Sequence, residues 1–176
     1  MLSLIIFIPL IAALGLLMVS RDNTATIKMV AVGAAGASLA LSLWLLFSFD
    51  TTNAEMQFVQ MFHWVPALHI NYLVGVDGIS LWMVVLTSFL GLLAILFSFN
   101  QKEGLRNFMA LMLALEAGTL GVFLALDTIL FYVFWELMLV PTYFLIGIWG
   151  EGRKVYATIK FVIFTLVGSL LMLVAI

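Results

Sequence analysis

The sequence contains no cysteine and few charged residues among its 176 residues. Without cysteine it can form no disulfide bond, no thiolate metal site and no cysteine-ligated iron–sulfur cluster. Seven basic and nine acidic residues give a net charge of −2, so no basic excess indicates binding to nucleic acid. The sequence also lacks a GxGxxG loop, a P-loop and a pair of histidines at haem-ligand spacing within a membrane-length span. These absences argue against a nucleotide, a haem or another redox centre on this chain.

The residues that are present are mostly apolar. Hydrophobic residues make up 65% of the chain and charged residues 9%, with a mean hydropathy of +1.26. Soluble domains are about 45–50% apolar and about 25% charged. A chain of this size cannot bury so much apolar surface in a water-soluble core, which predicts an integral membrane protein in a lipid bilayer. Residues 1–20 lack the basic start of a cleaved signal peptide, so we expect a retained first span.

Six apolar stretches are long enough to cross a membrane, which takes about 20 residues. They predict an all-α fold class, a polytopic transmembrane helix bundle that forms one domain over residues 1–176. The long apolar run 107–149 suits two crossings, and Asp127 is the expected break because it can cap the helix that follows. Asp77 is the expected cap of the third span. The predicted spans are residues 2–19, 27–49, 79–99, 106–126, 129–149 and 155–176.

Basic residues are unevenly distributed among the connections. The second connection, residues 50–78, holds no Lys or Arg, and the fourth holds only Asp127. By the positive-inside rule the odd connections face the cytoplasm, and the N-terminus lies outside, on the periplasmic side. This bias fits a bacterial cell (inner) membrane, with an organelle membrane as the alternative. The basic residues of the odd connections are Arg21, Lys28, Lys102, Arg106, Arg153 and Lys154.

The second connection has strand-like composition. Its segments MQFVQMF and HINYLVGV are rich in β-branched and aromatic residues, which predicts a short hairpin or an interfacial segment on the outer surface. His63 and His69 lie in this loop. Two histidines without a third ligand make a weak metal site, so surface histidines beside Trp64 and Tyr72 are favoured and no metal is expected.

Three ionisable residues lie inside the predicted spans: Glu116, Glu136 and Lys160. Glu116 is about 15 Å and Glu136 about 20 Å from the inner end of its span. Both are therefore near the middle of a hydrocarbon core about 30 Å thick, where a charge costs at least ~2.5–3.5 kcal/mol. Such residues mark ion pathways by default; the alternative is a neutral carboxyl with one structural hydrogen bond. For Glu116, the small residues 117–119 also suit a tight helix contact.

The surroundings of Glu136 favour a proton-relay role. Tyr132 and Tyr143 lie on or near its helix face, where their hydroxyls could hydrogen-bond a carboxyl or a water molecule. Pro141 cannot donate to the carbonyl of Leu137, which leaves that backbone group for another partner such as water. A carboxyl in the middle of the membrane beside a hydratable backbone is a plausible relay station.

Lys160 has two interpretations. It lies only about 7–8 Å inside the sixth span, so its ammonium group could reach the lipid headgroups. It is about 12 Å from Glu136 by the same count, too far for a direct ion pair. Water between the two side chains could still couple them.

Three segments resemble a known family: GVDGISLW (75–82), the run 113–147 that includes FWELMLVP, and YATIKFVIFTLVGSLLML (156–173). They are similar to the antiporter-like membrane subunits of respiratory complex I, the NADH:quinone oxidoreductase, and most similar to those of the chain M or subunit 4 type. FWELMLVP is the specific motif. GVDG is shared more widely with sister subunits and with multisubunit cation/proton antiporters.

The resemblance implies a proton-translocating subunit of the membrane arm, surrounded by other membrane subunits that include antiporter-like sisters. NADH oxidation and quinone reduction elsewhere in the complex would supply the energy. FMN and iron–sulfur clusters would be on partner subunits, with no cofactor on this chain. The family's fifth-span glutamate matches Glu136, and its sixth-span lysine matches Lys160.

The family continues well beyond six spans, in inverted repeats, and pairs its fifth-span glutamate with a lysine on the seventh span. The sequence ends at Ile176 within an apolar run. We therefore expect the N-terminal part of a longer subunit; the alternative is that another chain supplies the remainder. For the function, the alternatives are a subunit of a multisubunit cation/proton antiporter and a purely structural role in a membrane arm.

Overall fold

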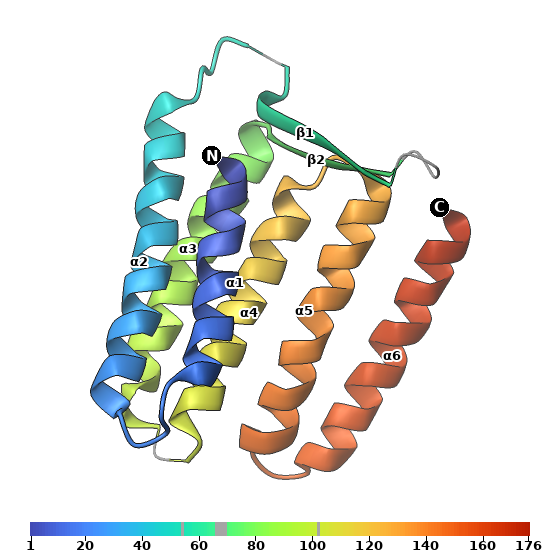
Figure 1. Cartoon of the computed structure of the whole chain (residues 1–176). Helices are drawn as coiled ribbons and strands as arrows, with labels where there is room; N and C mark the ends of the chain where they lie inside the picture. Colours follow the sequence, from blue (N-terminus) through green and yellow to red (C-terminus); the bar gives the residue numbers. More distant parts are fainter. Residues whose placement is uncertain (54, 66–69, 102) are drawn as a thin grey trace.

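A computed structural model describes residues 1–53, 55–65, 70–101 and 103–176. Their architecture is a bundle of membrane-length helices with one two-stranded sheet across one end (Figure 1). The predicted residues His69 and Lys102 lie outside the described part of the chain. The helices are α1 (Leu2–Met18), α2 (Thr24–Ser48), α3 (Gly78–Phe97), α4 (Leu105–Leu124), α5 (Thr128–Trp149) and α6 (Lys154–Ala175), with a short 3-10 helix, η2 (Ser98–Asn100), after α3.

The predicted all-α transmembrane bundle is confirmed. The helix ends agree with the six predicted stretches to within about three residues, because each apolar run stops where polar residues begin. Among the described residues, five helices are long and apolar enough to span a membrane, and α1 is shorter at 17 residues. A helix of that length rises about 25 Å, at the lower limit for a crossing.

Helix α4 lies at the centre of the bundle. It contacts α1, α2, α3 and α5, whereas α6 packs along α5 at one edge (Figure 1). Half of the span in α4 is buried, against about a tenth of the span in α6. The large apolar side chains of α6 are therefore mostly exposed, as expected for a surface that meets lipid or further protein.

The three basic connections lie at the same end of the bundle. The turns α1–α2, α3–α4 and α5–α6 are at the lower end in Figure 1, and the N-terminus and the sheet are at the upper end. This grouping is the one on which the positive-inside argument depends. Which side of a membrane this end faces stays a prediction.

The predicted hairpin is confirmed. Strands β1 (Gln57–Val65) and β2 (Ile70–Val76) pair antiparallel. The hairpin lies across the ends of α1, α4 and α5 (Figure 1) and is held there by hydrogen bonds: Leu126 N donates to Leu73 O at 2.9 Å, and Ser3 Oγ donates to Gln60 Oε1 at 2.7 Å. His63 is exposed on β1, and its Nδ1 lies 2.9 Å from Asn71 Oδ1.

The two predicted helix caps are present. Asp77 Oδ1 accepts hydrogen bonds from the backbone N–H groups of Ile79 and Ser80, and the Ser80 hydroxyl accepts one from the Asp77 N–H in return. Asp127 Oδ1 accepts from Ile129 N and Leu130 N, each at 3.0 Å. Each aspartate therefore satisfies N–H groups that the first turn of a helix leaves open.

We expect Asp77→Ala to lower the free energy of unfolding by about 1 kcal/mol, because the cap of α3 is lost. Thermal unfolding of the detergent-solubilised protein measures this change. Asp22→Ala removes an exposed acid that caps no helix and is the matched control. Equal stability of Asp77→Ala and wild type would contradict the prediction.

The Asp77 cap also has a defined pH dependence. The Ser80 backbone N–H, followed by the Ser80 side chain, holds the pKa of Asp77 below its ordinary value of 3.8. A carboxyl with a lowered pKa in the folded state stabilises the fold above its unfolded pKa and loses this effect as pH falls through the folded value. The difference in stability between wild type and Asp77→Ala should therefore be full at neutral pH and shrink below about pH 4.

Candidate functional site

Glycines on α4 bring α5 unusually close. A Cβ at Gly118 would be 3.2 Å from the backbone of Met138, and a Cβ at Gly121 would overlap the ring of Phe134. Small residues permit this approach of two helix backbones in a membrane. Thr119 Oγ1 lies 3.4 Å from Met138 Sδ at the same contact. The α4–α5 contact thus fixes how the acids of the two helices are placed.

The register of this contact separates the two acids. Because Gly118 meets Met138 in an antiparallel pair, Glu136 is level with Leu120 rather than with Glu116. The offset from Glu116 to Leu120 is four residues, about 6 Å along the axis. Both acids are thus in the middle portion of their helices, about one turn apart.

Glu136 lies at the α5–α6 interface. It is half-buried, and its Oε1 is fully buried without a hydrogen-bond partner among the described residues. The Tyr132 side chain, one turn earlier on α5, interacts with the Glu136 carboxyl and with Ser169 on α6. The sequence predicted Tyr132 beside Glu136, and the geometry brings them together. A buried carboxyl oxygen without a partner is costly, so a further polar group is expected at this place.

A cavity of about 190 Å³ lies next to Glu136. It holds Tyr143, predicted near the Glu136 face, and Thr165 of α6. The volume exceeds the ~10–15 Å³ that one water requires, and a carboxyl and two hydroxyls are enough polar partners for water. The full lining is Glu136, Leu139, Val140, Tyr143, Val162, Thr165 and Leu166.

Helix α6 contributes hydroxyl residues that the sequence analysis missed. Ser169 is buried, and Thr165 lines the cavity. Thr158 is also buried and lies 3.6 Å from a Cβ position at Gly147 of α5. The spacings between these three residues, seven and four, place them on one helix face. This periodicity could have identified them from the sequence, because hydroxyl residues that recur on one face of an apolar span mark its polar side.

Pro141 is buried one residue before the Thr142 hydroxyl, which donates to Met138 O at 2.8 Å. Pro141 itself has no N–H for the carbonyl of Leu137. The Leu137 carbonyl, next to Glu136, therefore lacks its usual backbone hydrogen bond within α5, as the sequence indicated.

Glu116 faces a different helix. It is 4% exposed, and both carboxyl oxygens are buried without a hydrogen-bond partner among the described residues. A Cβ at Gly91 of α3 would be 2.8 Å from its Cδ, so the carboxyl points at α3. Glu116 thus lies apart from the Glu136 cavity, at a close contact with α3, while its small neighbours Gly118 and Thr119 make the predicted tight helix contact with α5.

Lys160 lies apart from both acids. It is exposed, and its Nζ lies 5.7 Å from the ring centroid of Tyr156. The contacts Gly147–Thr158 and Tyr132–Ser169 set it level with residues 141–145, roughly 8–13 Å from Glu136 along the axis. A direct pair is excluded by this arrangement, in agreement with the distance expected from the sequence.

Comparisons with known proteins agree with the resemblance. Residues 125–176 match the family described as NADH:quinone oxidoreductase/Mrp antiporter, TM. The chain is 44% identical to NADH-quinone oxidoreductase subunit M of Rhodobacter capsulatus and 40% identical to F(420)H(2) dehydrogenase subunit M of Methanosarcina mazei. Each of these matches covers 99% of this chain and 35% of the relative.

A solved structure has the same fold. A chain of respiratory complex I from Thermus thermophilus superimposes with a TM-score of 0.85 and 30% identity, over 99% of this chain and 35% of that chain. The predicted resemblance to antiporter-like subunits of complex I is therefore confirmed. The chain spans about a third of the length of the relatives that it matches.

Proposed function

We propose that this chain, which is similar over nearly its whole length to M subunits of NADH-quinone oxidoreductases, is part of a proton-translocating membrane-arm subunit of such a complex. It would couple NADH oxidation and quinone reduction in partner subunits to proton movement. FMN and iron–sulfur clusters would be on those partners. Its neighbours would be other membrane-arm subunits, including antiporter-like sisters, in a bacterial inner membrane.

One observation carries the proposal for this chain: the Glu136 carboxyl, with a buried oxygen that lacks a hydrogen-bond partner among the described residues, lies beside a cavity with room for water. A carboxyl there can take a proton from one water molecule and release it to another. The Tyr132 side chain interacts both with this carboxyl and with Ser169, which links the carboxyl to α6. Proton transfer needs a hydrogen-bonded chain, and Tyr143 and Thr165 supply hydroxyls for it along the cavity.

We assign different roles to the other ionisable residues. Glu116 would be a second protonatable site, on the α3 side of α4, about one turn from Glu136 along the bundle. Lys160 would act on Glu136 only through intervening water or further protein, because it lies on the exposed face of α6. The chain would complete a proton path only together with groups outside these residues.

The second candidate is a subunit of a multisubunit cation/proton antiporter, because the matched family includes both classes. The relatives at 44% and 40% identity are subunits of dehydrogenase complexes, which favours the first candidate. The two candidates differ in the energy source for proton movement: NADH oxidation in the first and an ion gradient in the second.

Reconstitution of the intact complex into liposomes distinguishes the candidates. NADH with a quinone should acidify the vesicle lumen, as read by a pH-sensitive dye, without added sodium. A proton flux that needs a sodium gradient and ignores NADH would support the antiporter instead. Quinone reduction with no proton movement in sealed vesicles would contradict both.

A further inference from the structure

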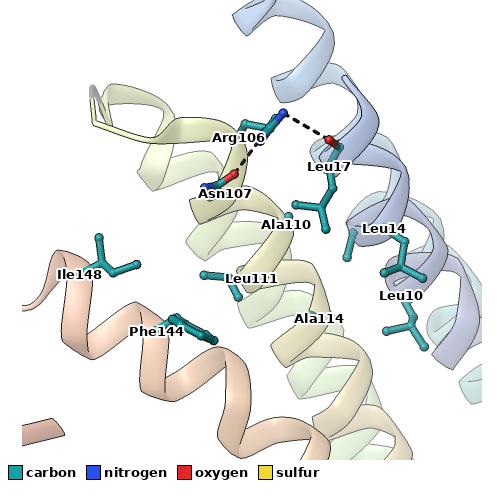
Figure 2. Close-up of a pocket in the computed structure, with 11 residues that line it drawn as sticks. Leu10, Leu14, Leu17, Arg106, Asn107, Ala110, Leu111, Ala114, Phe144 and Ile148 are labelled. Carbon is teal, nitrogen blue, oxygen red and sulfur yellow. Dashed lines mark hydrogen bonds between the residues drawn. The ribbon is translucent and has the colours of Figure 1, made fainter. Parts of the chain in front are cut away.

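An apolar groove runs between α1, α4 and α5 near the end that carries the basic connections. Figure 2 shows leucines of α1 on one side and Phe144 and Ile148 of α5 on the other, with α4 as the floor. The groove has a volume of about 460 Å³, within the usual range for a small-molecule site. Leu14 and Ile148 are 60% and 51% exposed, so the groove is open at the bundle surface.

Arg106 closes the groove at its polar end. Its Nη1 donates to Leu17 O and its Nε donates to Asn107 Oδ1, each at 3.2 Å (Figure 2). Nη1 also donates to Val19 O at 3.1 Å. These bonds to the end of α1 fix the guanidinium over the apolar walls. Within the described residues, Nη2 forms no hydrogen bond, so that part of the guanidinium can still donate.

A polar pocket lies next to the groove, on the Arg106 side. Its volume is about 290 Å³, and it shares Arg106 and Asn107 with the groove. Arg21 and Thr24, from the start of α2 and the turn before it, complete its lining together with Gly104 and Leu105. Neither arginine forms an ion pair within the part of the chain that the structure describes. An apolar groove thus adjoins a pocket lined by two arginines, neither of which has an ion-pair partner among the described residues.

We propose that the groove and the adjoining pocket together bind one anionic phospholipid, with an acyl chain in the groove and the phosphate between Arg106 and Arg21. A guanidinium recognises phosphate through several N–H donors in one plane. Basic pockets between transmembrane helices are known to suit anionic headgroups. A packed protein helix would fill the apolar part but leave the two arginines without an anion, which disfavours it as the occupant. The proposal is independent of the proton relay at Glu136.

Photolabelling of the full-length protein in its complex tests the proposal. The complex is placed in lipid nanodiscs with a photoreactive acyl chain carried either by phosphatidylglycerol or by phosphatidylcholine. We expect peptides containing Leu111 and Phe144 to be labelled preferentially by the anionic probe. Arg106→Gln should reduce this labelling roughly fivefold. Arg153→Gln removes a basic residue at the same end that lines neither pocket and should change nothing.

A second variant keeps the test decisive if Arg106→Gln fails to assemble. Leu111→Trp fills the groove and leaves both arginines in place, so labelling by the anionic probe should again fall. Equal labelling by the two probes would overturn the headgroup assignment. Crosslinks from this groove to protein, with no lipid label, would show that a further segment or subunit occupies it and would overturn the proposal.

Discussion

Glu136→Gln should reduce NADH-driven proton pumping by the assembled complex by at least about tenfold. Glutamine has the size and shape of glutamate, so the contact with α6 is kept. Its amide cannot take up and release a proton in the range in which the carboxyl does. The buried carboxyl oxygen beside the cavity would be replaced by a group that hydrogen-bonds water but interrupts the relay. Dye quenching in sealed vesicles, alongside the rate of quinone reduction, measures the loss.

Two controls separate this effect from a packing defect. Glu136→Asp keeps a titratable group at the site and should retain a substantial part of the pumping. Glu55→Gln removes an exposed acid of the connection that precedes the hairpin and should be neutral. Unchanged pumping in Glu136→Gln, with normal assembly, would show that the relay role is wrong. Loss of assembled complex in Glu136→Gln but not in Glu136→Asp would instead indicate a structural carboxyl.

The helices could be predicted because each depends on local composition. The apolar runs, the caps at Asp77 and Asp127 and the basic connections are all written in neighbouring residues. A span ends where polar residues must leave the hydrocarbon, so its bounds follow from the same signal. The hairpin was predictable for a related reason, since aromatic and β-branched residues are concentrated in the two segments that form its strands.

The arrangement of side chains within the bundle was only partly predictable. Tyr132 and Tyr143 were placed correctly because they share a helix with Glu136, and helix geometry fixes such neighbours. Ser169 and Thr165 belong to another helix, and their contact depends on how α6 is rotated against α5. The rotation of α6 about its axis is set by how the surfaces of both helices pack, and it cannot be predicted from a single sequence.

The same distinction explains Glu116. Its depth in the membrane is predicted by counting residues, and it is buried among the helices of the bundle. Its direction depends on Gly91, which leaves room on α3 for a carboxyl. The sequence shows a glycine at position 91, but it does not show which residue of another helix packs against it. Two acids at similar depth therefore serve different interfaces, and each interface can be tested by itself.

Gly121→Val should destabilise the bundle more than any surface substitution, by about 1–3 kcal/mol or enough to prevent assembly. A Cβ at Gly121 would overlap the ring of Phe134, which is only 5% exposed and has little room to turn. The two helices would have to separate, and the α4–α5 contact that sets the level of Glu136 would be lost. Thermal unfolding in detergent and the yield of assembled complex measure the effect.

Gly36→Val is the matched control, because a Cβ at Gly36 of α2 has no neighbour within 4 Å. It makes the same chemical change inside a helix, so any difference between the variants isolates the contact with Phe134. Combining Gly121→Val with Phe134→Ala should recover part of the lost stability, since the added methyl groups would then occupy the space of the removed ring. Equal destabilisation by Gly121→Val and Gly36→Val would mean that helix propensity, and not the close approach of α4 and α5, sets the requirement for glycine. The position of Glu136 would then have to be fixed by the other contacts of α5, such as that of Gly118 with Met138.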